Sequence, residues 1–315
     1  MPDIVITEFM DEAAVAALSA DFDVRYDPKL VDRPDELAGL AAGAKALIVR
    51  NRTQVREPLI EAAGRLVAIG RLGVGLDNID VVACRKRGIQ VLPATGANDV
   101  SVAEYVITGV LMLLRGAFGA SSDVAAGLWP RERLIGRETA GKVLGLIGFG
   151  SIARAVAHRA AGLGMEVVAY DPYVDPTDSA WARHHSRSLP LDQLLAISDA
   201  VSLHVPLSPE THHLLDAARL GRMRQGAVLI NAARGGVIDE PALADAVRRG
   251  HLAGALLDVF ETEPLGADNP FSGLANIWLT PHVAGVTLES NERVSAVTAE
   301  NVRRALQAAF DEGRA

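Results

Sequence analysis

The sequence has little of two features that would point to particular classes of protein. There is one cysteine in 315 residues, Cys84, so the chain cannot form an internal disulfide bond, and we expect this thiol to be a small buried side chain. Basic residues are also outnumbered by acidic ones, which leaves a formal net charge of −8. A general nucleic-acid-binding protein needs a basic face, so this charge argues against a nucleic-acid partner.

Long hydrophobic runs are also absent. The longest apolar segment, YVITGVLMLL, is about half of a membrane span, and Gly109 interrupts it. The first residues, MPDIVITEFMDEAA, lack the basic start and the long apolar stretch of a signal peptide. We therefore expect a soluble cytoplasmic protein with no membrane partner.

What is present is an ordinary globular composition in a chain longer than one core usually serves, so we expect two domains. Short apolar runs alternate with amphipathic helical patterns, and this order predicts parallel sheets covered by helices on both faces. One series of expected strands lies in DIVITEF, FDVRYD, ALIVRN, LVAIGRLG and IQVLPAT, and a second in KVLGLIG, MEVVAY, AVSLHVP, AVLINAA, LAGALLDVF and NIWLTPH. The predicted fold class is α/β, with two doubly wound parallel-sheet domains whose ligands bind at the carboxyl ends of the strands.

Three helices stand out beside the strands. One helical stretch is predicted from Val100 to about Ala126, and a long amphipathic helix from about Leu288 to Phe310. A shorter one, in EPALADAVRRG, follows Asp239, which we expect to cap its amino end.

The clearest motif lies in KVLGLIGFGSIA, where Gly148, Gly150 and Ala153 follow an apolar strand and open a helix. In a dinucleotide-binding turn the first residue allows a tight bend, the second lets the backbone approach a pyrophosphate, and the third keeps helix and strand close. The next strand ends in Asp171, suitably placed to accept hydrogen bonds from a ribose. No arginine follows it to receive a 2′-phosphate, so the sequence favours NAD over NADP as cofactor.

Polar groups follow three later strands of the same series. Arg234 ends one strand, Asp258 and Glu263 follow the next, and His282 follows the last. In an open parallel sheet such ends point into one crevice. An arginine can hold a carboxylate, and a histidine beside a carboxylate can exchange a hydroxyl proton, so with a dinucleotide these groups suit hydride transfer at a 2-hydroxy acid.

Taken one at a time, these residues have simpler interpretations. Arg234 could belong to a surface ion pair, His282 could be structural, and Glu263 could be an ordinary loop acid. Their convergence with the dinucleotide motif favours the catalytic interpretation. The histidine pairs His184–His185 and His212–His213 lack metal-ligand spacing, so no metal site is predicted.

The stretches GLIGFGSIA, AYDPY, HVPLSPET, NAARGGVIDE, LDVFETEP and TPHVAG resemble the D-isomer-specific 2-hydroxyacid dehydrogenases, in their phosphoglycerate dehydrogenase-like form. The resemblance covers essentially the whole chain, because IVRNRT, GRLGVGLDNID and NDVSVAEYVI match motifs of the family's first domain and hinge. One departure is Ala153, where the family usually has a third glycine. The resemblance implies an NAD-dependent oxidoreductase that transfers a hydride between NAD and a D-configured 2-hydroxy acid.

The resemblance also implies residue roles. Arg234, Glu263 and His282 match the family's catalytic residues. The cofactor-binding set is Gly148, Phe149, Gly150, Ser151, Ile152, Asp171, His204, Val205, Pro206, Thr211, Ala232, Asp258 and Val102, with Asp258 at the nicotinamide amide. The substrate-binding set is Arg50, Asn51, Arg52, Arg71, Val74, Gly75 and Arg234.

The domain organisation follows from the same resemblance. It implies a Rossmann NAD-binding domain, residues 100–285, inserted into a flavodoxin-like substrate-binding domain made of residues 1–99 and 286–315. Family members are usually homodimers joined by a helical arm, here about residues 115–140, and Trp129 on that arm would reach the partner's site.

Several cations precede or follow strands of the predicted substrate domain, among them Arg50, Arg52 and Arg71. They point to a substrate with a second anionic group such as a phosphate or sulfonate, although Arg52 and Arg71 could instead pair with acids elsewhere. In detail, the amino-acid sequence is similar to those of enzymes acting on (S)-sulfolactate. This resemblance implies that the chain oxidises (S)-sulfolactate to sulfopyruvate. D-3-phosphoglycerate or another D-2-hydroxy acid is the alternative substrate.

Two other functions remain open at this point. The same fold serves as an NAD-sensing transcriptional corepressor, although nothing in this sequence suggests peptide recruitment. A formate-type dehydrogenase is a second alternative, but that chemistry needs no proton relay and would leave Glu263 without a role.

Overall fold

The computed structural model describes residues 1–311 of the chain. By their internal contacts these residues divide into two compact units. The first unit comprises Met1–Asn98 together with the segment that begins at Val286, and the second comprises Asp99–Gly285.

The first unit is built on a parallel sheet of five short strands. They are β1 (Ile4–Ile6), β2 (Val24–Tyr26), β3 (Ala46–Val49), β4 (Ala68–Arg71) and β5 (Gln90–Pro93). Their order in the sheet is β2-β1-β3-β4-β5, and Ile4 lies opposite Val24 on one side and Ala46 on the other. This is the strand order of flavodoxin-like folds, and each of these strands lies in a predicted apolar run.

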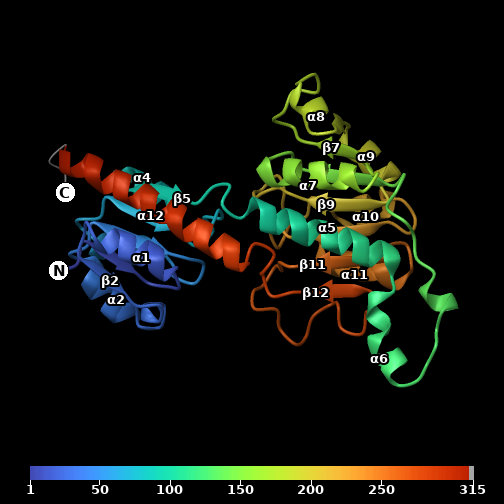
Figure 1. Cartoon of the computed structure of the whole chain (residues 1–315), viewed down its shortest axis with the longest axis horizontal. Coiled ribbons are helices and arrows are strands. Elements are labelled where there is room, and N and C mark those ends of the chain that lie inside the picture. The colour runs from blue at the N-terminus through green and yellow to red at the C-terminus, as the bar shows by residue number, and fades with distance from the viewer. Residues whose placement is uncertain (312–315) are drawn as a thin grey trace. The chain divides into compact units, whose positions relative to one another are not determined.

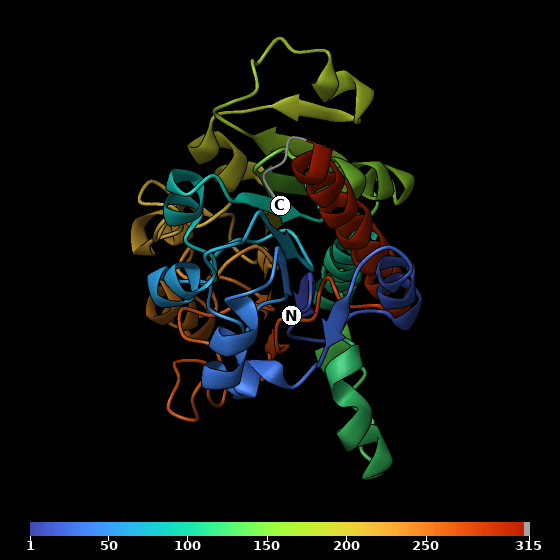
Figure 2. The same cartoon turned by 90° about the vertical axis from the view of Figure 1, so that its left-hand side faces the viewer.

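Helices cover both faces of this sheet. Figure 2 shows α1 (Glu12–Ser19) and α12 (Leu288–Asp311) on its right and shorter helices on its left. The shorter helices are α2 (Pro34–Ala41), α3 (Glu57–Ala62) and α4 (Val81–Lys86). Cys84 on α4 is fully buried in the core between the sheet and these shorter helices, as expected for a single thiol.

The second unit contains, within residues 99–285, a parallel sheet of seven strands. They are β6 (Val143–Ile147), β7 (Glu166–Tyr170), β8 (Ser186–Ser188), β9 (Ala200–Leu203), β10 (Val228–Asn231), β11 (Gly254–Leu257) and β12 (Ile277–Leu279). Their order is β12-β11-β10-β9-β6-β7-β8, the dinucleotide-binding order extended by one strand. The direction of winding reverses between β6 and β9, so this is where a ligand is expected.

Most strands of the second unit are apolar because helices bury both faces of the sheet, while the edge strand β8 is polar. On one face lie α5 (Asp99–Arg115) and α7 (Ser151–Gly162), which pack against each other (Figure 1). The other face is covered by α9 (Leu191–Ile197), α10 (Ala217–Arg222) and α11 (Glu240–Arg248). α8 (Ala180–Arg183) contacts β8 at the edge of the sheet. The predicted fold class, α/β with two doubly wound parallel sheets, is confirmed.

The helical stretch predicted from Val100 to about Ala126 is wrong beyond Arg115. α5 ends there because Gly116 adopts a left-handed conformation, with φ of 63°. After a short turn, α6 (Ser121–Ala125) starts in a direction bent by 70° from α5. In Figures 1 and 2, α6 and the segment after it extend away from the second sheet.

Within residues 1–311, no single helix is long and apolar enough to span a membrane, although α5 and Phe118–Ala125 meet the length and composition criteria as a bent pair.

Candidate active site

The glycine-rich turn after β6 has the geometry of a phosphate cradle. Gly148 adopts φ of 92°, and a Cβ there would lie 2.4 Å from the carbonyl oxygen of His204. A Cβ on Gly150 would have no heavy atom within 4 Å, so the backbone is open on that side. Gly150 is the N-cap of α7 and provides no side-chain cap, which leaves the first N–H groups of the helix available. These features fit the pyrophosphate of a dinucleotide.

Asp171, at the end of β7, lies directly beside this turn. One of its carboxylate oxygens accepts a hydrogen bond from the backbone N–H of Phe149 at 2.8 Å, and the other from Tyr173 at 2.9 Å. Phe149 is buried and stacks on Trp181 with ring centroids 4.2 Å apart. Asp171 therefore holds the backbone of Phe149, which lies between the two glycines of the turn. It stays only partly buried, as expected of an acid predicted to bind a ribose.

The segment after β9 forms the opposite side of the switch point. The hydroxyl of Thr211 donates to the carbonyl of Pro206 at 2.6 Å and accepts from the N–H of Ser208 at 2.8 Å, which closes the loop. The Nε2 atom of His204 is buried and has no hydrogen-bond partner within the described residues. Burial lowers the pKa of His204 to about 4, so its ring is neutral near pH 7.

Acid is expected to weaken the fold through His204. Its pKa is about 4 in the folded chain against an ordinary value of 6.5, so between these values the unfolded chain binds a proton that the folded chain does not. The free energy of unfolding therefore falls as the pH is lowered through this window. Denaturant unfolding of His204→Gln should show a shallower fall than the unchanged chain, and an equal fall in both would contradict the assignment.

Arg234 lies on a turn that the side chain of Asn231 stabilises by hydrogen bonds. The side-chain amide of Asn231 donates to the carbonyl of Arg234 at 2.9 Å and accepts from the N–H of Ala233 at 3.0 Å. Gly235 follows because a Cβ there would lie 1.8 Å from the carbonyl oxygen of Phe260. The turn thus packs backbone against backbone on the segment after β11. Sequence reasoning missed Asn231, although a buried asparagine at a strand end was a visible signal.

The helix after this turn begins as predicted. Asp239 is the N-cap of α11, and its carboxylate accepts from the N–H of Ala242 at 2.9 Å. Asp239 is therefore a structural cap, which matches the sequence-based expectation.

Glu263 and His282 meet at the carboxyl edge of the second sheet. Nδ1 of His282 lies 2.7 Å from Oε2 of Glu263, and the other oxygen of Glu263 accepts from the N–H of Phe260 at 3.1 Å. Both side chains remain partly exposed, at 44% for His282 and 35% for Glu263. With Nδ1 donating to the carboxylate, the ring is held in one tautomer and its Nε2 is left for a substrate hydroxyl.

Asp258 holds the loop that carries His282. Its buried carboxylate accepts from the hydroxyl of Thr280 at 2.6 Å and from the N–H groups of Val283 and Ala284, both at 2.8 Å. His282 itself adopts φ of 56°, a strained conformation for a non-glycine residue, and its N–H donates to the carbonyl of Asp258 at 2.9 Å.

The hydrogen-bond chain continues from Thr280 to α5. The hydroxyl of Tyr105 lies 2.5 Å from that of Thr280, and since Thr280 donates to Asp258, Tyr105 donates to Thr280. Burial raises the pKa of Tyr105 to about 12, so the phenol keeps its proton. Sequence reasoning missed Tyr105 and Thr280, because neither residue type at these positions signals such a chain.

Replacing Asp258 by alanine is expected to lower the free energy of unfolding by about 2–4 kcal/mol, since it leaves the N–H groups of Val283 and Ala284 and a threonine hydroxyl without their acceptor. Denaturant unfolding measures the change. Asp268→Ala, an exposed loop acid, serves as the control and should have no effect. Equal stability of the two variants would contradict the role assigned to Asp258.

The remaining residues predicted to bind the cofactor lie in or beside the same sheet. Ala232 is half-buried just after β10, and Val102 is buried on α5 in the core cluster that also contains Phe149. Ser151 is exposed and Ile152 partly buried in the first turn of α7, while Val205 is partly buried after β9.

In the first unit, Glu8 organises the loop that carries the predicted substrate residues. Its buried carboxylate accepts from the N–H groups of Arg50 at 2.9 Å, Arg52 at 3.1 Å and Thr53 at 3.0 Å. Burial lowers the pKa of Arg50, partly offset by the charge of Glu8. Glu8 was missed by sequence reasoning, because a single acid after a strand gives no indication of what it holds.

The cations of this unit differ in their partners. The guanidinium of Arg50 donates to Asn291 at 2.8 Å, and the side chain of Arg71 donates to the carbonyl of Leu72 at 2.9 Å. Arg52 forms an exposed ion pair with Asp32, the alternative that the sequence left open. The other predicted substrate residues are Asn51 and Val74, which are exposed, and Gly75, which is half-buried.

The fold and this arrangement are those of a dehydrogenase, and the chain belongs to the D-isomer specific 2-hydroxyacid dehydrogenase family. The model of that family's NAD binding domain matches residues 107–284. The chain is thus an oxidoreductase that acts on the CH–OH group of a 2-hydroxy acid with a nicotinamide dinucleotide, as the sequence predicted.

Particular relatives support the same assignment. The chain is 57% identical to an (S)-sulfolactate dehydrogenase of Chromohalobacter salexigens over 97% of this chain and 99% of that one. It is 41% identical to a D-3-phosphoglycerate dehydrogenase of Mycobacterium leprae, of which it spans only 58%. A solved structure of a D-lactate dehydrogenase from Aquifex aeolicus, complexed with NAD and lactic acid, superposes with a TM-score of 0.83 at 30% identity, covering 99% of this chain and 96% of that one.

Proposed function

We propose that this chain oxidises (S)-sulfolactate to sulfopyruvate with NAD as the hydride acceptor. The observation that carries the proposal is the Glu263–His282 pair, with 2.7 Å between Oε2 and Nδ1, on a dinucleotide fold whose neighbouring loop bears Arg234. The substrate is favoured by the 57% identity, over almost the whole chain, to a protein named for that reaction.

The stereochemistry of the substrate agrees with the family. In the naming rules a carbon that bears sulfur outranks a carboxyl group, so (S)-sulfolactate has the same spatial arrangement as a D-2-hydroxy acid. The residues assigned to the carboxylate and the hydroxyl would therefore hold (S)-sulfolactate in the same orientation as another D-2-hydroxy acid.

The mechanism assigns one role to each residue. Arg234 binds the substrate carboxylate through its planar guanidinium and polarises the adjacent oxygen. Nε2 of His282 takes the hydroxyl proton as the C2–H bond breaks and the carbonyl forms. Glu263 holds the ring through Nδ1 and stabilises the resulting imidazolium. NAD would supply the hydride acceptor, and in the reverse direction protonated His282 returns the proton.

The cofactor proposal rests on the residues around the cradle. Gly148–Ile152 would hold the pyrophosphate and Asp171 the ribose hydroxyls, with His204, Val205, Pro206, Thr211, Ala232, Asp258 and Val102 lining the rest. A carboxylate at Asp171 disfavours a 2′-phosphate because the two negative charges repel, so we propose NAD rather than NADP.

The first unit is proposed to bind the substrate. Arg50 is the cation we assign to the sulfonate, because Glu8 fixes its backbone and Asn291 its guanidinium. The N–H groups of Val74 and Gly75 are proposed to bind the carboxylate. Arg52 already pairs with Asp32, so we assign it a weaker contribution to substrate binding.

A substrate panel tests this proposal. The purified chain is assayed with NAD or NADP against (S)-sulfolactate, D-3-phosphoglycerate, D-lactate and D-glycerate, by following reduced-cofactor absorbance. We expect turnover of sulfolactate with NAD. Turnover of D-lactate or glycerate with none of sulfolactate or phosphoglycerate would overturn the dianion proposal, and the absence of any hydride transfer would favour a cofactor-sensing protein.

We also propose that the chain forms a homodimer through the arm after α5. The apolar side chains Phe118, Leu128, Trp129 and Ile135 are 57%, 56%, 75% and 82% exposed. Such a set of exposed large apolar side chains is typical of a protein interface. Light scattering is expected to give a dimer for the unchanged chain and a monomer for Leu128→Glu combined with Ile135→Glu; a monomeric unchanged chain would contradict this.

A further inference from the structure

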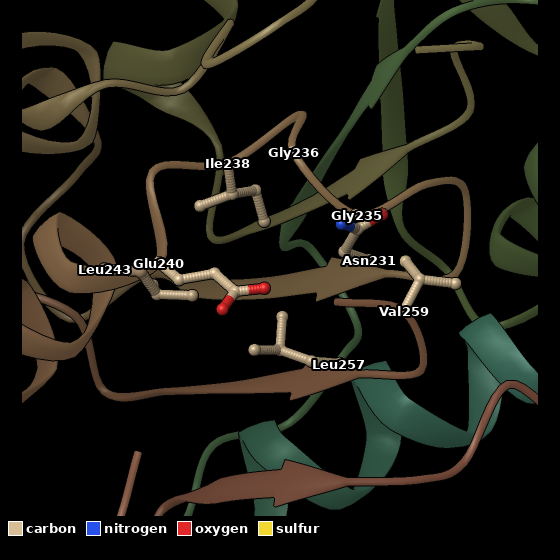
Figure 3. Close-up of a pocket in the computed structure, with 8 residues that line it drawn as sticks. All are labelled: Asn231, Gly235, Gly236, Ile238, Glu240, Leu243, Leu257 and Val259. Carbon is tan, nitrogen blue, oxygen red and sulfur yellow. The ribbon is translucent and has the colours of Figure 1, made fainter. Parts of the chain in front are cut away.

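A buried acid outside the proposed catalytic set lies beneath the loops of the site. Glu240, the first residue of α11, is only 9% exposed and lines a small pocket with Asn231 and Gly235. In Figure 3 its carboxylate points into this pocket, with Ile238 on one side and Leu257 on the other. Burying a carboxylate costs free energy unless it is hydrogen-bonded. The group that donates to Glu240 therefore indicates which part of the chain this carboxylate stabilises.

That partner is the segment that carries Glu263. Glu240 accepts a hydrogen bond from the backbone N–H of Glu261 at 2.7 Å. Burial raises the pKa of Glu240, and the charges of Glu261 and Glu263 raise it further, while the hydrogen bond from Glu261 and the nearby His213 lower it. The charges of two other acids thus act on the Glu240 carboxylate, and the hydrogen bond from the backbone N–H of Glu261 holds it in place.

The same segment is held at two more points. Nε2 of His213 lies 2.9 Å from Oε1 of Glu261. Glu261 precedes Glu263 by two residues, so this segment carries two glutamates that each pair with a histidine. The N–H of His213 donates to the carbonyl of Gly236 at 2.7 Å, next to the Arg234 turn. The loops after β9, β10 and β11 are therefore connected to one another by direct hydrogen bonds.

We propose that Glu240 is a positioning residue that fixes Glu263 relative to Arg234. α11 follows the Arg234 turn directly, so its first residue is tied to that turn by the chain and to the Glu263 segment by the hydrogen bond to Glu261. Losing this bond frees the segment to shift and carries Glu263 away from His282. A displacement of about 1 Å at a reacting group lowers the rate by roughly 100-fold. This inference rests on the proposed roles of Glu263 and His282.

Four variants test it, all assayed with the 2-hydroxy acid that the unchanged chain turns over best. Glu240→Ala removes the acceptor, and Glu240→Met removes it while filling the pocket. Glu240→Gln keeps an oxygen that can accept from the N–H of Glu261. Asp245→Ala, on the same helix, removes an exposed carboxylate that pairs with Arg249 and is the control.

We expect kcat to fall by roughly 10–100-fold in the Ala and Met variants, with KM for NAD within twofold of the unchanged value. Gln and the control should keep at least half of the unchanged kcat. Normal kcat in a folded Ala or Met variant would overturn the proposal, as would a Gln variant that is as slow as Ala. An inactive unchanged chain would instead contradict the proposed function, so the two failures are distinguishable.

Discussion

Replacing His282 by asparagine lowers kcat for the oxidation of the 2-hydroxy acid by roughly 10²–10⁴, the range expected when a general base is lost. Asparagine is the chosen replacement because it tolerates the left-handed backbone that His282 adopts, with φ of 56°. The loop that Asp258 holds is therefore expected to keep its shape. The change removes the proton acceptor and the contact with Glu263 while the dinucleotide cradle, on other strands, stays intact.

Steady-state kinetics together with a titration of NAD binding measure this effect. The dissociation constant of NAD should stay close to that of the unchanged chain while kcat falls. His158→Gln, on the exposed side of α7, is the matched control and should retain full activity. A kcat for His282→Asn within a few-fold of the unchanged chain would remove His282 from the role of general base.

The second large effect is expected at Arg234. Replacing it by lysine keeps the positive charge but loses the planar pair of donors that a carboxylate binds in two places. We expect kcat/KM to fall by roughly 10²–10³, the loss found when one donor to a developing charge is removed, with a higher KM for the 2-hydroxy acid.

The control for Arg234→Lys is Arg249→Lys at the C-cap of α11, where the arginine forms an exposed pair with Asp245 and kinetics should not change. An Arg234→Lys variant with unchanged kcat/KM would mean that only a point charge is needed at this position. The binding of the substrate carboxylate would then have to be assigned to other groups.

Most of the fold could be predicted from the sequence because strands buried on both faces are continuous apolar runs. The exception among the strands is β8, whose residues Ser186–Ser188 are polar and partly exposed at the sheet edge, so no hydrophobic pattern marks them. The error at the end of α5 has a similar origin, since Gly116 interrupts a helical pattern that continues on both sides of it.

The candidate site was predictable to the extent that it lies at strand ends. Arg234, Glu263 and His282 each follow a strand of one parallel sheet, and topology alone brings such positions to one edge. The supporting residues were not predictable. Asn231 and Glu240 act through hydrogen bonds to backbone groups, and the sequence does not indicate which backbone group a buried polar side chain will meet.

We propose that this dehydrogenase selects a 2-hydroxy acid with a second anionic group, and a comparison of two substrates tests this selectivity directly. In one preparation with saturating NAD, kcat/KM is measured for (S)-sulfolactate and for D-lactate. Without the sulfonate, the partly buried Arg50 assigned to it would stay without its anion, so we expect a ratio of roughly 10² or more in favour of sulfolactate. Equal values, or a preference for D-lactate, would contradict it.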